Sequence, residues 1–229
     1  VDTARGLGND YSAFVIYNVS SVPYKVVATY RSNTISPLLL PTIIQSAAEK
    51  YNSCFVLIET NDIGQQVCDI LHHDLEYDNV LTTASDPKSG VQVLSSGFGQ
   101  QTKLGVRTTK QTKKFGCSNL KSLVENNKLL LNDDTIIYEL MRFVAVNNSY
   151  EAEDGNDDTV MCCVIFAWMT QQTYFKDLTN IDTWKILQAE KQPQLDDEVI
   201  PFFVSTEDMD IDANTVFSVN NDKWLMFPS

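Results

Sequence analysis

The amino-acid sequence predicts an α/β fold, a mixed β-sheet with helices on both faces. Two strand-like stretches near the amino terminus are followed by alternating helix and strand patterns, and then by further helices. That order is typical of a sheet layered between helices. With 229 residues and 43% hydrophobic content, the chain can bury the core of one such domain and still carry an appendage.

The first elements are a predicted hairpin, a helix and a central strand. Ala13–Val19 and Lys25–Arg31 have the composition of strands, and Pro23 in their connection indicates a turn. Pro37–Tyr51 has helical periodicity, with prolines that fit a first turn. Cys54–Glu59 is a continuous apolar run that ends in an acid, which is typical of a strand buried on both faces.

The middle of the chain continues the alternation. Asp62–Leu75 is expected to form an amphipathic helix and Asn79–Thr82 a short strand. Asp86–Gly105 is rich in glycine and serine and contains a short alternating piece, so we expect a protruding loop or hairpin there.

Helices dominate the next part of the pattern. Ser118 is a suitable N-cap for a helix over Ser118–Asn126, which precedes a short strand, Leu129–Leu131, and a helix over Asp133–Val146. Thr159–Thr170 is apolar on nearly every face, which indicates a buried helix. The polar residues before it suit a helix start; they are Asn156, Asp157 and Asp158.

Two regions are expected, a domain over 1–175 and an acidic carboxyl-terminal appendage over 176–229. After Phe175 the sequence becomes acidic and only weakly periodic, with short strands expected at Pro201–Ser205 and Thr215–Val219. From Asp177 to Asp222 eleven acids stand against two bases. We expect this appendage to pack on the domain or to trail from it.

Charge is distributed unevenly along the chain. The net charge of −13 alone argues against nucleic-acid binding. Between Val91 and Lys128, however, seven basic residues stand against one acid. Basic residues interleaved with Thr and Gln favour phosphate contact without base reading, although a solvated loop is the common alternative. The candidates for DNA contact are Lys103, Arg107, Lys110, Lys113 and Lys114.

Other kinds of site find little support in the sequence. The five cysteines include no CxxC spacing, and the only histidines are the neighbours His72 and His73, so neither a zinc site nor a His-based nucleophile is indicated. No Walker motif occurs, so no ATP hydrolysis is predicted. The acidic stretch before Asp158 lacks the ligand spacing of an EF-hand loop, so a calcium site of that kind is not indicated either. No apolar run approaches the roughly 18 residues of a membrane span. Because the chain starts with Val1 instead of Met, we expect it to be part of a longer protein.

Three acids stand where a metal site could form. Asp2 precedes a glycine turn, Glu59 ends the apolar strand, and Asp158 opens the buried helix. Carboxyl ends of strands are where sites gather in open α/β sheets, and a divalent ion would offset the repulsion between carboxylates. Each acid also has a simpler explanation. Asp2 could be a solvated terminal residue, Glu59 could pair with a lysine, and Asp158 could be a first-turn acid favoured by the helix dipole.

Four stretches together resemble a known family. They are VDTARGLGNDYSAF at 1–14, VLIETNDIGQQV at 56–67, GVRTTKQTKKFGCSNLKSLVE at 105–125 and YEAEDGNDDTVMCCVIFAW at 150–168. They are similar to the nuclease domain of the large terminase subunit of myovirus-type tailed bacteriophages, which packages the viral genome. The similarity extends from Val1 to about Asp182 and implies an RNase H-like fold.

The resemblance also implies a site. In that family the first strand carries an Asp, a neighbouring strand ends in a Glu, and a helix begins after an Asp pair. The catalytic metal ligands implied by this match are Asp2, Glu59 and Asp158. The match also implies that Asp157 binds a second metal or supports the first ligands, and that Asp10 is an auxiliary acid. The family usually has His before the Asp pair. This chain has Asn156, which puts a proton-transfer role at that position in doubt.

The implied activity is endonucleolytic cleavage of concatemeric viral DNA with little sequence specificity, using one or two Mg²⁺ or Mn²⁺ ions. The implied partners are double-stranded DNA, the portal and the small terminase subunit, in the host cell cytoplasm, with no membrane and no ATP on this chain. Two alternatives remain open: another RNase H-like nuclease such as a junction resolvase, and a non-catalytic acidic interaction module.

Overall fold

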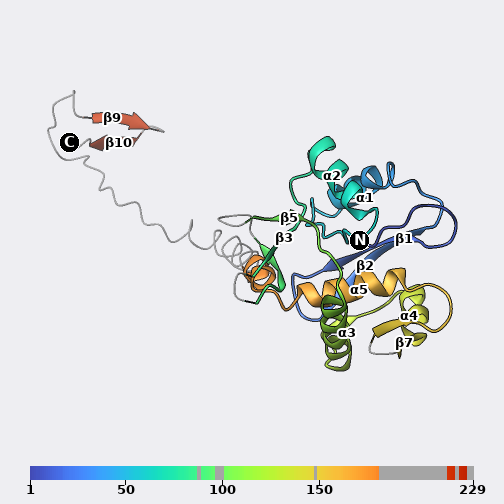
Figure 1. Ribbon diagram of the computed structural model, residues 1–229. Helices are drawn as coiled ribbons and strands as arrows, with labels where there is room; N and C mark the ends of the chain where they lie inside the picture. The colour runs from blue at the N-terminus through green and yellow to red at the C-terminus, as the bar shows by residue number, and fades with distance from the viewer. Residues whose placement is uncertain (87–88, 96–100, 147–148, 181–215, 220–221, 226–229) are drawn as a thin grey trace. The chain divides into compact units, whose positions relative to one another are not determined.

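The computed structural model describes residues 1–86, 89–95, 101–146, 149–180, 216–219 and 222–225 (Figure 1). The chain divides into two units, Val1–Thr183 and Trp184–Ser229. In the second unit an antiparallel pair is described, β9 (Val216–Val219) with β10 (Asp222–Leu225). The expected strand at 201–205 lies outside the described residues. Within the described ranges, no helix has the length and apolar character to cross a bilayer.

The predicted hairpin is confirmed. β1 (Ser12–Asn18) and β2 (Tyr24–Ser32) pair antiparallel, with an irregularity between Ile16 and Tyr17. The start of β2 also pairs in parallel with β6 (Leu129–Leu130), the short strand predicted there.

Two extended segments continue the sheet beyond β1. Asp2 forms an antiparallel bridge with Ala13, with N–O distances of 2.9 and 3.0 Å. On its other side the Val1 carbonyl accepts from Glu59 N at 2.9 Å. The 56–59 segment then forms parallel bridges, Val56 with Val80 and Glu59 with Val106. The apolar run that was predicted to be a central strand is therefore extended and central, but it is paired through single bridges.

A second small sheet follows. β3 (Thr82–Ser85) lies between β4 (Gln92–Ser95) and β5 (Lys103–Leu104), antiparallel to both. The loop or hairpin expected over Asp86–Gly105 thus contains two strands. The strand expected over Asn79–Thr82 begins only at its last residue.

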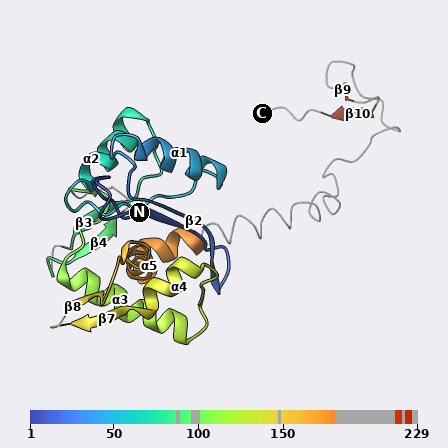
Figure 2. The ribbon, with the colours of Figure 1, turned by 90° about the vertical axis from the view of Figure 1, so that its right-hand side faces the viewer.

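Helices cover both faces of the sheet. On one face lie α1 (Leu40–Lys50) and α2 (Gly64–Asp69), which continues into a π-helical turn, η1 (Ile70–Asp74). On the other lie α3 (Lys110–Glu125), α4 (Asp134–Met141) and α5 (Asp158–Met169). Figures 1 and 2 show the β1–β2 hairpin between these two groups. Residues 173–180 are also helical.

Side chains of the 56–59 segment separate two hydrophobic clusters. Val56 and Ile58 pack with residues of α1, α2 and η1, whereas Leu57 packs with the cluster that contains α3 and α5. Strand alternation sends successive side chains to opposite faces, so this segment is buried from both sides. Its last residue, Glu59, is held in place by both cores.

Two predicted helix boundaries are wrong. Thr109, not Ser118, is the N-cap of α3; its hydroxyl accepts from Thr112 N at 3.1 Å. The helix predicted over Asp133–Val146 ends at Met141, and the chain turns into β7 (Phe143–Val146), which pairs with β8 (Ser149–Ala152). The first error arose because the basic stretch before Ser118 was not assigned to a helix. In the second, β-branched and aromatic residues after Arg142 favour a strand over a helix.

Helices α3 and α5 meet at a glycine. A Cβ at Gly116 would lie 2.5 Å from the Val164 carbonyl oxygen, a backbone atom that cannot rotate away. The glycine therefore sets the separation of the two helices, and α5 in turn carries Asp158 at its first position.

We predict that Gly116→Ala destabilises the fold. Alanine improves helix propensity by about 1 kcal/mol, but overpacking costs about 1–3 kcal/mol, so a net loss of up to about 2 kcal/mol in the free energy of unfolding is expected. Urea denaturation measures it, with the exposed Ser118→Ala on the same helix as control. A Gly116→Ala variant as stable as wild type would show that the helices can separate freely.

Candidate metal centre

Asp2 and Glu59 lie on neighbouring extended segments. The backbone bonds of Val1 to Leu57 O (2.8 Å) and from Glu59 N to Val1 O (2.9 Å) hold the two acids beside each other. Glu59 is 8% exposed. Gly64 starts α2 directly against the Glu59 carbonyl, where a Cβ would clash. The local backbone therefore leaves the Glu59 side chain little freedom to move away from Asp2.

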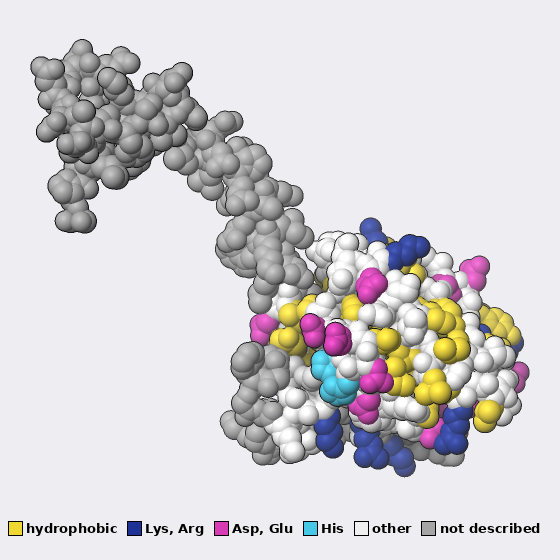
Figure 3. All heavy atoms as spheres, turned by 90° about the horizontal axis from the view of Figure 1, so that it is seen from above, with side chains coloured by type: hydrophobic (Ala, Val, Ile, Leu, Met, Phe, Trp, Pro, Cys, Tyr) yellow, Lys and Arg dark blue, Asp and Glu magenta, His cyan; other side chains and the backbone are white. Residues whose placement is uncertain are grey.

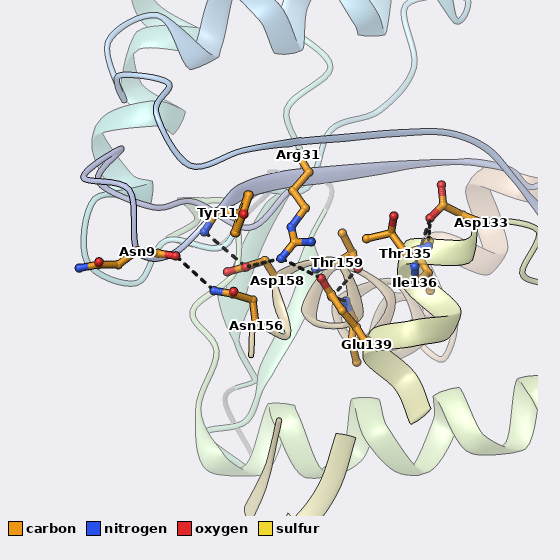
Figure 4. A network of polar contacts seen from close by, with 11 residues as sticks. Asn9, Tyr11, Arg31, Asp133, Thr135, Ile136, Glu139, Asn156, Asp158 and Thr159 are labelled. Atoms are coloured by element: carbon orange, nitrogen blue, oxygen red, sulfur yellow. Dashed lines mark hydrogen bonds and ion pairs between the residues drawn. The ribbon is translucent and has the colours of Figure 1, made fainter. Parts of the chain in front are cut away.

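Asp158 reaches the same region from α5. It is the first residue of that helix and is 9% exposed. Its Oδ2 accepts from Tyr11 N at 3.3 Å and lies 4.0 Å from the Arg31 guanidinium (Figure 4). Tyr11 directly precedes β1, so the helix start is tied to the hairpin that also pairs with Asp2.

The charges of Glu59 and Asp158 act on Asp2. Burial raises the pKa of Asp2 well above its usual value, and the charges of Glu59 and Asp158 raise it further. Burial also raises the pKa of Glu59, against the Val1 ammonium and Lys113, which lower it. The pKa of Asp158 is raised to about 6, first by burial. The site therefore concentrates negative charge that the surrounding protein only partly offsets.

Hydrogen bonds orient Glu59 within the site. Asn61 Nδ2 donates to Glu59 Oε1 at 2.9 Å and to the Thr108 carbonyl at 2.9 Å. This amide connects the acid to the segment that follows Val106, the bridge partner of Glu59. Asn61 is a residue that the sequence analysis did not select, although it stands two positions after the acid.

The remaining predicted acids lie around this group. Asp157, the N-cap residue of α5, has its Oδ2 atom 3.5 Å from Nζ of Lys113 on α3. This ion pair joins the two helices. Asp10 is exposed, in the loop that leads to Tyr11. Asn156, where the family usually has His, donates to the Asn9 carbonyl at 3.3 Å (Figure 4).

The predicted DNA-contact residues separate into two groups. Lys103 and Arg107 are exposed and line a hollow of about 390 Å³ together with Asn61 and Thr108, two neighbours of Glu59. Lys110 and Lys114 are exposed on the first turns of α3. Lys113 differs, because its side chain is only 22% exposed and faces Asp157.

A further hollow lies beside α2 and η1, lined in part by Asp62, Asp69, His73 and Asp74. The face shown in Figure 3 carries histidine side chains with acidic side chains near them. Acids and a histidine on one surface do not by themselves make a site.

The donor chemistry at Asp2, Glu59 and Asp158 fits a hard divalent cation, since all three are carboxylates and their charges repel one another. In the arrangement of the described residues, no three His, Cys, Asp or Glu side chains stand close enough to hold one ion together. The three carboxylates therefore match a divalent cation in ligand type and charge, but they do not lie close enough together to form a complete ligand set.

Arg31 and Glu139 were missed by the sequence analysis. Arg31 Nη2 lies 3.3 Å from Glu139 Oε1, and Glu139 is 4% exposed. The available signal was weak: a charged residue at the end of a predicted strand, and an acid on the apolar side of a predicted helix.

The raised pKa of Asp158 leads to a prediction about stability. A carboxyl whose folded pKa lies above its unfolded value loses stabilisation as pH rises from about 4 through about 6. In EDTA at pH 7.5, Asp158→Asn is therefore expected to be more stable than wild type by about 1–3 kcal/mol, with the difference shrinking toward pH 4.

Urea denaturation at several pH values tests this expectation. Asp62→Asn is the matched control, because Arg5 lowers the pKa of that exposed carboxyl and its loss should not stabilise the protein. If Asp158→Asn were less stable than wild type at pH 7.5, the ionised carboxylate would have to be favourably held in the fold.

A comparison with known families identifies the domain. The model of the terminase RNaseH-like domain matches residues 1–169. This match confirms the expected RNase H-like fold class and the resemblance to the nuclease domain of the large terminase subunit. Membership implies a nuclease role in DNA packaging. The chain belongs to the family of terminase RNaseH-like domains.

Proposed function

We propose that this chain is a Mg²⁺- or Mn²⁺-dependent endodeoxyribonuclease that cuts concatemeric viral DNA during packaging, with little sequence specificity. The observation that carries the proposal is the grouping of Asp2, which is partly buried, with the buried acids Glu59 and Asp158, whose charges raise its pKa. An RNase H-like fold that gathers uncompensated carboxylates in this way is suited to divalent ions and phosphoryl oxygens. The family match supports the nuclease part of the proposal.

Each residue has a proposed task. Asp2, Glu59 and Asp158 would hold the ion, with Asp157 serving a second ion or supporting the first set. When bound, such an ion lowers the pKa of a water molecule and offsets charge on the scissile phosphate and the leaving oxygen. Asn61 orients Glu59 through its 2.9 Å hydrogen bond. Lys113, near Asp157 and close enough to lower the pKa of Glu59, keeps a positive charge beside the phosphate position.

DNA contact is proposed for the two basic groups on either side of this centre. Lys103 and Arg107 line the hollow that Asn61 and Thr108 connect to Glu59. Lys110 and Lys114 extend along the exposed side of α3. None of these side chains needs to contact a base, so the surface would follow the phosphate backbone, as expected of a nuclease with little sequence preference. Asp10, exposed near Tyr11, keeps its auxiliary role as a proposal.

The partners named by the resemblance also remain proposals. We propose that the region 1–175 carries the nuclease and that the acidic region 176–229 faces other packaging components, such as the portal or the small terminase subunit, in the host cell cytoplasm. Positive surfaces on those partners would suit its eleven acids between Asp177 and Asp222.

We predict that Asp158→Asn and Glu59→Gln each abolish cleavage while the protein stays folded. Each change removes one anionic oxygen ligand and keeps the size of the side chain. Cleavage of linear and circular plasmid in Mg²⁺, Mn²⁺ or EDTA measures the effect, with circular dichroism as the check of folding. Glu125→Gln is the control, because that exposed acid pairs with Lys121 at the far end of α3.

Metal-dependent cleavage by the control and wild type, lost in both site variants, is the expected pattern. Cleavage by Asp158→Asn at the wild-type rate would remove that residue from the centre. Activity on branched DNA with none on linear duplex would favour a junction resolvase instead.

The basic surface gives a separate prediction. Lys110→Gln with Lys114→Gln should weaken DNA binding and reduce the slope of log K against log salt concentration by up to about 2, since each lost phosphate contact accounts for roughly 0.9. Binding is measured by fluorescence anisotropy on a duplex in EDTA. The control is Lys121→Gln with Lys128→Gln, two exposed lysines at and beyond the other end of α3. An unchanged slope in the first variant would exclude this turn from the DNA surface.

A further inference from the structure

An ion pair lies directly behind Asp158. Arg31, near the end of β2, reaches from the hairpin toward α5, and Glu139, on α4, reaches the same point from the other side (Figure 4). The Arg31 guanidinium is 3.3 Å from Glu139 Oε1 and 4.0 Å from Asp158 Oδ2. A single arginine therefore contacts the carboxylate of the centre and a second, more deeply buried acid.

Arg31 is held on more than one side. Its guanidinium carbon lies 3.7 Å from the centre of the Tyr11 ring, a stacked arrangement in which an arginine is well ordered. Tyr11 also donates its backbone N–H to Asp158 Oδ2. The ring and the backbone of one residue thus fix both the arginine and the carboxylate that it approaches.

Glu139 provides the cap that α5 otherwise lacks. The N-cap residue Asp157 makes no side-chain capping bond. Instead Glu139 Oε2 accepts from Thr159 N at 3.0 Å and Val160 N at 3.2 Å, and also from the Thr159 hydroxyl. Buried helix termini need such partners for their free N–H groups, and an anion there is also favoured by the helix dipole. Glu139 therefore anchors the turn on which Asp158 stands.

These contacts leave the two Asp158 oxygens in different states. Oδ2 accepts a hydrogen bond from Tyr11 N at 3.3 Å and forms an ion pair with Arg31 at 4.0 Å, whereas no hydrogen bond or ion pair to Oδ1 is formed within the described part of the chain. We infer that the Arg31–Glu139 pair is a positioning device: it holds one oxygen of Asp158 and thereby directs the other to the proposed ion. The inference rests on the proposed function, because it assumes that Asp158 is a ligand.

Charge alone would give the opposite effect. A positive guanidinium near a ligand opposes cation binding, so removal of Arg31 for electrostatic reasons would tighten it. Arg31 and Glu139 together, however, are close to neutral. A variant that loses both charges keeps the field at Asp158 nearly constant and removes only the orientation. Outer contacts that orient a metal ligand typically account for about 10–100-fold in ion affinity.

The test is Mn²⁺ binding by the full chain, measured by isothermal titration calorimetry without DNA. The main variant is Arg31→Met with Glu139→Gln, in which the glutamine oxygen can still accept from Thr159 N and Val160 N. We expect its dissociation constant for Mn²⁺ to rise about 10–100-fold, with helix content unchanged by circular dichroism. Arg31→Lys in the presence of Glu139 is expected to recover part of the affinity.

Two matched controls separate positioning from general damage. Arg142→Met removes another arginine that stacks on a tyrosine (Tyr138, 4.1 Å) and pairs with an acid (Asp154, 3.7 Å), but has no contact with Asp158. Asp133→Asn keeps a capping side chain on the helix that carries Glu139 but removes the negative charge that the helix N-terminus favours. Both should bind Mn²⁺ as wild type does, although Asp133→Asn should melt earlier.

The outcomes are distinct. If wild type binds no Mn²⁺, the proposed function fails and this inference fails with it. If wild type binds Mn²⁺ and the double variant binds it equally or more tightly, only the positioning role is overturned. Weaker binding in Asp133→Asn to the same extent as in the double variant would also overturn it, because loss of helix stability would then explain the effect.

Discussion

The backbone pairing of the first two residues is the constraint on which the rest of the site depends. Asp2 bonds to Ala13 on one side, and Val1 bonds to Leu57 and Glu59 on the other. This pairing joins the β1–β2 hairpin to the 56–59 segment and places two acids side by side. Both flanking segments are buried, so the acids cannot separate to relieve their repulsion without disturbing both hydrophobic clusters.

The third acid of the site is on α5, and packing contacts determine the position of this helix. Gly116 allows α3 to approach the Val164 carbonyl closely, while Tyr17 and Phe166 stack with centroids 3.8 Å apart. These contacts set where the helix begins, and so where Asp158 lies. Burial raises the pKa values of Asp2, Glu59 and Asp158, and neighbouring negative charges raise those of Asp2 and Asp158 further.

Much of the fold followed from sequence patterns, and the misses have physical causes. The hairpin was predictable from its two β-rich stretches around Pro23, and the buried helix from a run that is apolar on nearly every face. The start of α3 was not, since Lys110, Lys113 and Lys114 resemble a solvated loop until Thr109 is seen to cap them. The three carboxylates were chosen from their places at the ends of predicted elements and from the resemblance. In the structure the charges of Glu59 and Asp158 raise the pKa of Asp2, although no three such side chains of the described residues stand close enough to hold one ion. Arg31 and Glu139 could not be found, because their pairing joins β2 to α4 over more than one hundred positions of sequence.

The central claim is that Asp2, Glu59 and Asp158 share a divalent ion. The most direct measurement is anomalous diffraction from crystals of the protein grown with Mn²⁺, at a wavelength where manganese scatters anomalously. The account predicts a peak bonded to oxygens of all three carboxylates, with Asp158 using the oxygen that Arg31 does not contact. A peak held elsewhere, for example near His73, with none among the three carboxylates, would contradict it.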